Sequence, residues 1–286
     1  MKPSRLRMGQ HMLNDTAHFL VNQVLPVSKK GTQNPSKLET NGRLLCTKPL
    51  KAKNLPSHFT LTTWNIQMGY QQSRLREDLP TVNGDLILLQ EVPVFTSKST
   101  PLFSAQKSYY AYTPDLFTTH PNTFYPFVHR GQITMSDVAP IQIQSIPLPH
   151  VSPAVPYNKK KIYPTPSTLY TQYKTKKGTL GVYNLHLDAF SRPAGRKLQF
   201  KKIAEHHHAT QDKYCIIAGD FNTFLGRVEL ALLTHKAGLH RAKTGGTLKF
   251  LKLDHILYSS NLKIDAKVVH KRSSDHSPIV AKVKIL

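Results

Sequence analysis

Apolar positions follow no clear period over residues 1–57, apart from a weakly amphipathic stretch at 11–25, and then recur in short runs. Continuous or alternating apolar runs of this length are typical of β-strands, and a spacing of three to four is typical of helices. We therefore expect a basic, weakly ordered extension at 1–57 and a folded domain at 58–286. The expected strands cover 59–66, 85–92, 132–135, 141–146, 167–174, 179–187 and 213–219, with more near the carboxyl end. The expected helices cover 71–79, ended by Pro80, 195–211 and 226–236.

Two segments of the domain show neither period. Residues 93–130 are aromatic and contain prolines, and residues 147–166 combine six prolines with Lys159, Lys160 and Lys161. We expect both to be irregular, the second as an exposed loop. Many strands, few helices and no repeated strand-helix-strand unit favour two sheets packed face to face, with helices outside.

Charge sets this chain apart from an ordinary soluble protein. Its 286 residues include 39 Lys and Arg against 16 Asp and Glu, a formal net charge of +23. Such an excess favours DNA, RNA or an anionic membrane as a partner, although a generally basic proteome would also produce it. Cys46 and Cys215 cannot form a disulfide framework, and Cys215 is expected to pack in an apolar strand. No apolar run approaches the roughly 18 residues of a membrane helix, and no secretory signal is recognisable, so we expect a cytoplasmic protein, with organelle targeting as the alternative.

Polar motifs cluster at the ends of the expected strands. They are Trp64-Asn65, Gln90-Glu91, Asn184-Leu-His186, Gly219-Asp220-Phe-Asn222, Leu253-Asp254-His255 and Ser274-Asp275-His276. An isolated Asn, Gln-Glu pair or His is usually a turn, a solvated strand end or a packing residue. The full set in this order is hard to explain in that way. Carboxylates and amides with neighbouring imidazoles indicate a metal-assisted reaction of a phosphate ester.

The ordered set resembles the endonuclease/exonuclease/phosphatase superfamily, whose fold is that of deoxyribonuclease I, over residues 59–285. The resemblance implies a four-layered α/β sandwich and hydrolysis of phosphate esters with Mg²⁺ or Mn²⁺. It implies that Asn65 and Glu91 bind the metal, with Asp275 beside it. It also implies that Asp220 and Asn222 activate the attacking water, that His186 and His276 contact the phosphate, and that Asp254 orients His276.

The sequence departs from the family pattern at Gly131-Gln-Ile-Thr-Met-Ser136, so His186 has no assigned partner. Arg192 and Arg196 open a helix after His186, and either could bind a phosphate or be a plain helix residue. His206, His207 and His208 point in different directions around a helix and are not expected to bind one metal. Lysines near 159–161 and 174–177 suit a nucleic-acid backbone or are solvated loop residues.

Three functions remain open at this point. The leading hypothesis is a nuclease of low sequence specificity, because nucleic acid is a long polyanion. The second is a phosphatase or phospholipid phosphodiesterase acting on inositol phosphates or sphingomyelin, and the third is a catalytically silent binding protein. The presence of every expected catalytic residue argues against the third. We expect a monomer that requires no protein partner.

Overall fold

The computed structural model describes residues 45–46, 53–93, 107–118, 126–153, 155–157, 160–235, 237–249 and 251–286. The expected stretch at 11–25 and the side chains of Lys159, Lys160 and Lys161 lie outside the described part. The strands of the described part are β1 (Leu45–Cys46), β2 (His58–Asn65), β3 (Leu86–Pro93), β4 (Tyr109–Thr118), β5 (Pro126–Ser136), β6 (Gln142–Pro147), β7 (Val155–Tyr157), β8 (Lys160–Thr165), β9 (Ser167–Thr175), β10 (Gly178–His186), β11 (Tyr214–Asp220), β12 (His240–Arg241), β13 (Asp254–Tyr258), β14 (Leu262–Val268) and β15 (Ile279–Ile285). Its helices are α2 (Gln72–Thr81), α4 (Pro193–Thr210) and α5 (Arg227–Thr234), with a 3₁₀ turn η2 (Gln67–Gly69).

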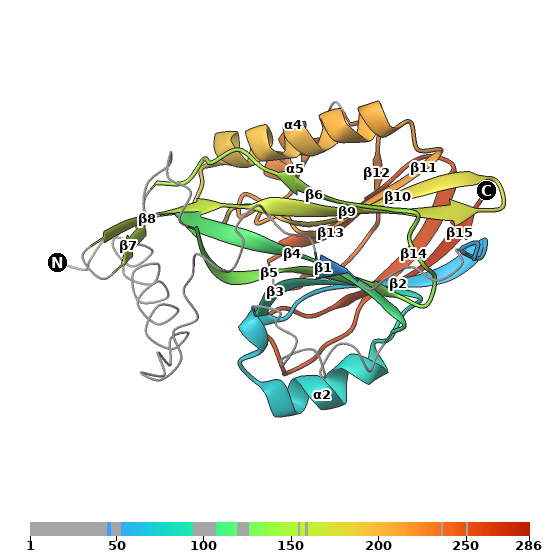
Figure 1. The fold of residues 1–286 in the computed structure, drawn as a ribbon, viewed down its shortest axis with the longest axis horizontal. Coiled ribbons are helices and arrows are strands. Elements are labelled where there is room, and N and C mark those ends of the chain that lie inside the picture. Colours follow the sequence, from blue (N-terminus) through green and yellow to red (C-terminus); the bar gives the residue numbers. More distant parts are fainter. Residues whose placement is uncertain are drawn as a thin grey trace.

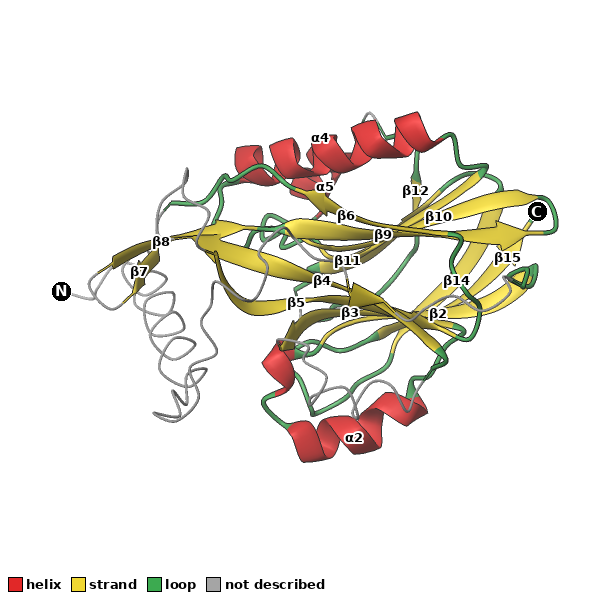
Figure 2. Ribbon diagram, viewed as in Figure 1, coloured by secondary structure: helices red, strands yellow, loops and turns green. Residues whose placement is uncertain are grey.

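These elements form two mixed sheets that pack face to face (Figure 1). The first sheet has the order β14-β15-β2-β3-β5-β4-β8-β7, with β1 added to β4, and the second has the order β12-β13-β11-β10-β9-β6. Helix α2 covers the outer face of the first sheet, and α4 with α5 covers the outer face of the second (Figure 2). The expected four-layered α/β sandwich is therefore confirmed.

Three apolar clusters fill the three spaces between the four layers. Leu88 of β3, Val182 of β10 and Ile216 of β11 belong to the cluster between the sheets. A second cluster joins the other face of β10 and β11 to Phe200 and Ile203 of α4, and a third joins β2 and β3 to α2. Strands β3 and β11 contribute alternate residues to clusters on both faces, which explains why their sequences are largely continuous apolar runs. Cys215 is buried in the second cluster as a free thiol, as expected.

Two pairs of parallel strands decide where the polar motifs meet. Strand β2 runs parallel to β3 in the first sheet, and β10 runs parallel to β11 in the second. Parallel neighbours end at the same edge of a sheet, so the motifs that follow β2, β3, β10 and β11 gather at one rim of the sandwich.

The expectation that residues 93–130 and 147–166 are irregular is wrong. Strand β4 and the start of β5 lie in the first segment, and β7 and β8 lie in the second. Pro114 made β4 unrecognisable, yet it fits there because β1 pairs with residues 111–112 and β8 begins pairing at Leu116, which leaves Pro114 between them. Helix α2 also runs one residue past Pro80.

The boundary of the folded domain also differs from the expected one. Leu55, assigned above to the extension, is 1% exposed and belongs to the core between the sheets, and β1 pairs with β4. Part of the segment before residue 58 is thus packed on the domain. None of the described helices is long and apolar enough to cross a membrane.

Gly219 provides a test of how closely β10 and β11 approach. Its φ is +142°, and an added Cβ would lie 2.0 Å from the carbonyl oxygen of Leu185, a backbone atom that cannot move aside. We expect Gly219→Ala to destabilise the protein by about 3 kcal/mol or more, measured by urea denaturation. Gly245→Ala is the control, because its added Cβ would meet only a side-chain methyl at 3.8 Å. Equal stability of the two variants would contradict the close approach.

Candidate active site

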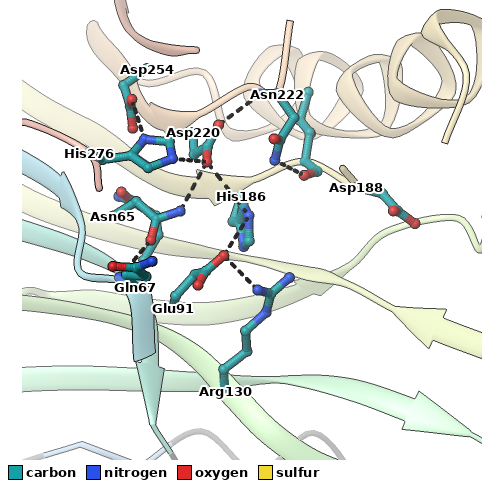
Figure 3. A network of polar contacts seen from close by, with 12 residues as sticks. Asn65, Gln67, Glu91, Arg130, His186, Asp188, Asp220, Asn222, Asp254 and His276 are labelled. Carbon is teal, nitrogen blue, oxygen red and sulfur yellow. Dashed lines mark hydrogen bonds and ion pairs between the residues drawn. The ribbon is translucent and has the colours of Figure 1, made fainter. Parts of the chain in front are cut away.

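The polar motifs meet at the rim where the two pairs of parallel strands, β2 with β3 and β10 with β11, end (Figure 3). Asn65 is the last residue of β2 and lies opposite Gln90, next to Glu91 of β3. His186 and Asp220 end β10 and β11 and are direct register partners. Asp254 begins β13 and is paired with Asp220 from the other side. The structure thus brings together residues that are up to 189 positions apart along the sequence, from Asn65 to Asp254, as expected.

A buried polar link joins the two sheets directly behind these residues. Gln90 of the first sheet donates from Nε2 to Oδ1 of Asn184 in the second sheet at 2.8 Å. Asn184 donates in return from Nδ2 to the carbonyl oxygens of Leu89 and Ile133, at 3.1 and 2.9 Å. Both side chains are 0% exposed, so each bond lies in surroundings of low dielectric constant, where a broken bond would be costly.

Asp220 occupies the centre of the site. Its Oδ2 accepts a hydrogen bond from Nδ2 of Asn65 at 3.0 Å and lies 3.8 Å from Nε2 of both His186 and His276. Its Oδ1 accepts the backbone N–H of Asn222 at 2.9 Å. The carboxylate is therefore held by donors from both sheets and 1% exposed, which makes it the natural proton acceptor of the site.

Asn222 is fixed in an unusual backbone conformation. Its φ is +49°, and its Nδ2 donates to the carbonyl oxygen of Leu187 at 2.8 Å. Because the amide nitrogen is bound to Leu187, the oxygen Oδ1 is turned to the other side of the side chain. This orientation suits an amide that accepts a hydrogen bond from a water beside Asp220.

Glu91 lies at a bulge of β3, where the pairing with β5 shifts register between Leu89 and Val92. Its φ of +53° turns the carboxylate toward the site instead of along the strand. Arg130 of β5 donates from Nη1 to Oε1 of Glu91 at 2.6 Å, and Nε2 of His186 lies 3.7 Å from the same oxygen. Burial alone would raise the pKa of Glu91, but the positive charge of Arg130 and then of His186 brings the pKa below its ordinary value. Glu91 is thus a carboxylate at neutral pH.

His276 and Asp254 form the tightest pair of the site. Nδ1 of His276 lies 2.7 Å from Oδ2 of Asp254. Burial lowers the pKa of the imidazole, but the carboxylates of Asp254 and Asp220 raise it to about 10. His276 is therefore protonated at neutral pH and points a second N–H toward Asp220 and the centre. Trp64 supports the loop by donating from Nε1 to the His276 carbonyl oxygen at 2.8 Å.

The partner that the sequence did not reveal for His186 is Asp115. Its Oδ2 lies 3.8 Å from Nδ1 of His186, at a second register shift, this time in β4. The backbone N–H of Ser167 donates to Oδ1 of Asp115 at 3.3 Å and holds the carboxylate in place. Burial and the charge of Arg130 lower the pKa of His186, yet the nearby carboxylate of Asp115 and the charges of Asp220 and Glu91 raise it overall. Residues 131–136, where the family pattern would have placed this partner, belong to the neighbouring strand β5.

Arg130 is the second residue that sequence reasoning missed. Its side chain is largely buried beside Glu91, and its charge also influences His186. The acids Glu91, Asp115, Asp188 and Asp220 more than offset the effect of burial and raise its pKa. A signal existed in the sequence: Arg130 precedes Gly131 at the start of the motif that departs from the family pattern.

The structure corrects the role expected for Arg196. Its Nε and Nη2 each lie 2.6 Å from Oε1 of Glu229, and Nη1 donates to the carbonyl oxygens of Asp188 and Ser191. The guanidinium is buried and holds the 188–191 turn against α5, so it cannot serve a substrate phosphate. Arg192 is exposed and occupies the position before the first turn of α4.

Asp275 lies at the outer edge of the site. Its backbone N–H donates to Oε1 of Gln67 at 3.2 Å, and its side chain is exposed. Desolvation raises its pKa, the charge of His276 lowers it and that of Glu91 raises it, which places Asp275 within electrostatic reach of both. The three adjacent histidines contribute no metal site: His206 lies 2.9 Å from the Tyr183 hydroxyl and 3.0 Å from the Gln144 side chain.

Charge balance indicates that this site suits a divalent cation. The acids of the site outnumber its basic groups: the acids are Glu91, Asp115, Asp220, Asp254 and Asp275, and the basic groups are Arg130, His186 and His276. Asp254 also has a buried oxygen, Oδ1, without a hydrogen-bond partner. Two sets of donors fit an ion. Asn65 and Glu91 offer oxygens as ligands. Asp220, Asp254 and His276 also bring polar atoms within 4.8 Å of one another, but in this set only the two carboxylates could bind a metal while His276 is protonated.

Asp115 provides a direct test of the electrostatics. Asp115→Asn removes one of the three acids that raise the His186 pKa and leaves Asp220 and Glu91 to oppose burial and Arg130, so the imidazole pKa is expected to fall. The imidazolium of His186 would then be lost at a lower pH than in the parent. Titration of the His186 ring by NMR measures this shift, and Asp137→Asn, at an exposed acid bound to Lys107, is the control. An unchanged His186 pKa in Asp115→Asn would contradict the pairing.

Comparison with known proteins agrees with the geometry of the site. Residues 62–276 match the model of the endonuclease/exonuclease/phosphatase family. No curated protein matches the chain at a significant level.

Solved structures show the same fold at low sequence identity. An endonuclease/exonuclease/phosphatase from Beutenbergia cavernae aligns over 80% of this chain and 72% of its own, with a TM-score of 0.61 and 15% identity. The human nocturnin catalytic domain aligns over 82% and 97%, with a TM-score of 0.58 and 17% identity. Sphingomyelinase C from Streptomyces griseocarneus aligns over 79% and 99%, with a TM-score of 0.54 and 13% identity. These likenesses establish the fold without choosing a substrate. The family match over residues 62–276 shows that this chain belongs to the endonuclease/exonuclease/phosphatase family of phosphoric ester hydrolases.

Proposed function

We propose that this protein is a divalent-metal-dependent phosphodiesterase that cleaves nucleic acid with low sequence specificity. The observation that carries the proposal is the contrast between an acid-rich catalytic rim and a chain with a net charge of +23. The acids serve the reaction, while the surrounding positive charge favours a polyanionic substrate. A sequence-specific nuclease would have to contact the edges of the bases, and none of the described rim residues has been assigned to such a contact.

The residues of the rim divide the chemistry between them. Asp220 is placed to accept a proton from the attacking water, and the Asn222 side-chain oxygen to orient that water. His276, protonated at neutral pH, and His186 point N–H groups at the centre, where they can donate to phosphate oxygens as negative charge develops. Asp254 and Asp115 orient the two imidazoles and favour their charged forms.

Arg130 adds a third cationic donor to this arrangement. In the structure it is bound to Glu91 at 2.6 Å, so an incoming phosphate and Glu91 would share one guanidinium. Its planar group suits two phosphate oxygens at once. Arg130 therefore completes a set of three cationic groups around the position of the phosphate.

Mg²⁺ or Mn²⁺ is the cofactor that the oxygen donors favour. Asn65 and Glu91 would hold it, with Asp275 at the edge of the site, because such hard oxygen ligands suit Mg²⁺. When bound, the ion supplies Lewis-acid stabilisation of the phosphate charge.

A phospholipid phosphodiesterase is the second candidate. Phe224 and Leu225 are exposed apolar residues that follow Asn222 almost directly, an unusual surface next to a site for nucleic acid. The sphingomyelinase C fold is also similar. An inositol polyphosphate phosphatase would use the same type of site, and the substrate assays below test it as well.

The first prediction of this function concerns the site. Hydrolysis of plasmid DNA is expected with Mg²⁺ or Mn²⁺ and is expected to stop in EDTA. Asp220→Asn and His276→Ala should each lower kcat by about two orders of magnitude or more, because each removes a group that acts in the transition state. Asp265→Asn, at an exposed acid on β14, is the control. Turnover that survives EDTA, or wild-type turnover in Asp220→Asn, would refute the mechanism.

The second prediction concerns the charge. Log affinity for duplex DNA should fall linearly with log salt, with a slope of about 0.9 per neutralised phosphate. Replacing Lys159, Lys160 and Lys161 by Ser should reduce the slope, because each lysine that contacts a phosphate contributes to it. The same change at Lys174, Lys176 and Lys177 is the control, because these exposed lysines lie near the turn between β9 and β10, at the opposite end of β10 from His186. Salt titration by fluorescence anisotropy measures both.

Parallel assays on sphingomyelin and inositol polyphosphates decide between the candidates. Hydrolysis of either lipid or inositol phosphate, with no DNA binding above background, would replace the nuclease proposal.

A further inference from the structure

Helix α5 is apolar on two faces, but the domain covers only one of them. Leu230 and Leu233 pack inward against the second sheet. Val228 and Leu232 point outward and are 68% and 55% exposed. A helix that is apolar on both faces is normally buried on both. The outward face of α5 therefore calls for a separate explanation.

The exposed apolar side chains extend beyond α5 to its neighbours. Leu225, 65% exposed, and Phe224, 47% exposed, lie in the turn before α5, and Leu198 of α4 is 55% exposed. Together with Val228 and Leu232 they form what we call the α5 face. The other large exposed apolar residues of the described chain, Tyr70, Ile141 and Leu286, belong to separate elements. The α5 face is thus a cluster of exposed apolar side chains and differs from the singly exposed apolar residues that are common on protein surfaces.

A groove of about 880 Å³ runs between α4 and α5 within this face. Phe200, Ala204 and Leu233 are among its lining residues. Figure 1 shows α4 and α5 as the outermost layer on their side of the described fold. The α5 face consequently lies on an outer surface of the domain.

The charged residues around the groove are basic. Lys197, Lys201, Arg227 and His235 line it. The nearby acids are already engaged: Glu205 pairs with Lys201 at 3.7 Å, and Glu229 is buried against Arg196. Exposed leucines and an aromatic ring with lysine and arginine beside them are the composition of a surface that binds an anionic bilayer, because long basic side chains reach the head groups while apolar ones enter the interface.

Charge argues against the other occupants of such a face. A second copy would bring the same basic residues opposite themselves. Residues 1–57 of the chain carry ten Lys and Arg against Asp15 and Glu39, so this segment would also be repelled. We propose that the α5 face docks the protein on a membrane surface that contains anionic phospholipids. This inference goes beyond the proposed function and holds whichever phosphodiester the site cleaves.

The position of the face relates docking to the active site. Phe224 lies two residues after Asn222, and its backbone N–H donates to the Asn222 carbonyl oxygen at 3.0 Å. The Phe224 ring also packs over the Arg196 guanidinium, 5.6 Å from its centroid. Docking through Phe224 and Leu225 would therefore hold the catalytic rim close to the bilayer surface.

The test is co-sedimentation of the full-length protein with vesicles. Vesicles of phosphatidylcholine with about a third phosphatidylserine are compared with pure phosphatidylcholine. Val228→Ser with Leu232→Ser removes apolar surface, and Lys197→Gln with Arg227→Gln removes charge. Matched controls are Ile141→Ser with Leu286→Ser, and Lys263→Gln with Lys284→Gln on strands β14 and β15 of the other sheet. Thermal unfolding and hydrolysis of the small soluble ester bis(p-nitrophenyl) phosphate are measured for every variant.

We expect binding to the anionic vesicles and much weaker binding to neutral ones. Each α5-face variant should weaken binding at least tenfold, while both controls bind as the parent does. Unfolding and hydrolysis of the soluble ester should stay unchanged in all variants, which separates docking from catalysis. Parent protein that does not bind anionic vesicles, or α5-face variants that bind as the parent does, would overturn the proposal. An equal loss of binding in the Lys263 and Lys284 control would also overturn it, because binding would then reflect overall charge. So would the finding that the parent is a dimer and that the Val228 and Leu232 changes dissociate it.

Discussion

The hydrogen bond between Gln90 and Asn184 is the constraint on which the site depends. Asn65 and Glu91 come from one sheet, and His186 and Asp220 come from the other, so the chemistry requires a fixed separation between two sheets that could otherwise slide. Apolar packing is largely nondirectional and does not define that separation to a fraction of an ångström. A buried amide pair that bonds across the gap, and to Leu89 and Ile133 at the same time, does define it. Gln90 lies one residue before Glu91, and Asn184 lies two residues before His186. The hydrogen bond therefore fixes the two sheets beside the catalytic side chains, where a displacement would matter most.

Acidic and basic side chains alternate in space along the rim, and this arrangement determines the electrostatics of the site. Each imidazole lies between acids, and Glu91 lies between Arg130 and His186. Burial by itself would favour the neutral forms of Glu91 and His276, yet the opposite charges beside them keep both ionised. The result is a set of charges held in place before any phosphate arrives. Preorganised charge of this kind needs no rearrangement during the reaction, which is the main way that protein sites stabilise a developing anion.

The sequence predicts the parts of this molecule in which local pattern and final environment agree. Strands β3 and β11 are continuously apolar over most of their length because they are buried on both faces. Each of the strands β2, β3, β10 and β11 ends in a polar motif, so both the strands and the site residues are recognisable. Asp115 and Arg130 were missed for a physical reason. Pro114 interrupts β4 at a position where a gap between β1 and β8 accepts it, and a pairing with His186 arises only from the folding of β4 beside β5 and β9. Arg196 shows the reverse error: its position after His186 suggested a phosphate contact, but Glu229, 33 residues later, takes its guanidinium.

The left-handed backbone at Glu91 and Asn222 has a consequence for the evolution of this protein. Side chains other than glycine in this region cost about 1–2 kcal/mol each, and here two of them, with φ of +53° and +49°, carry the carboxylate and the amide of the catalytic rim. Glycine would relax the backbone at either position and would also remove the functional group. Selection for thermal stability and selection for turnover therefore oppose each other at these two positions. A descendant that lost its activity would be free to exchange both residues, so Glu91 and Asn222 together are a record of whether a relative still catalyses.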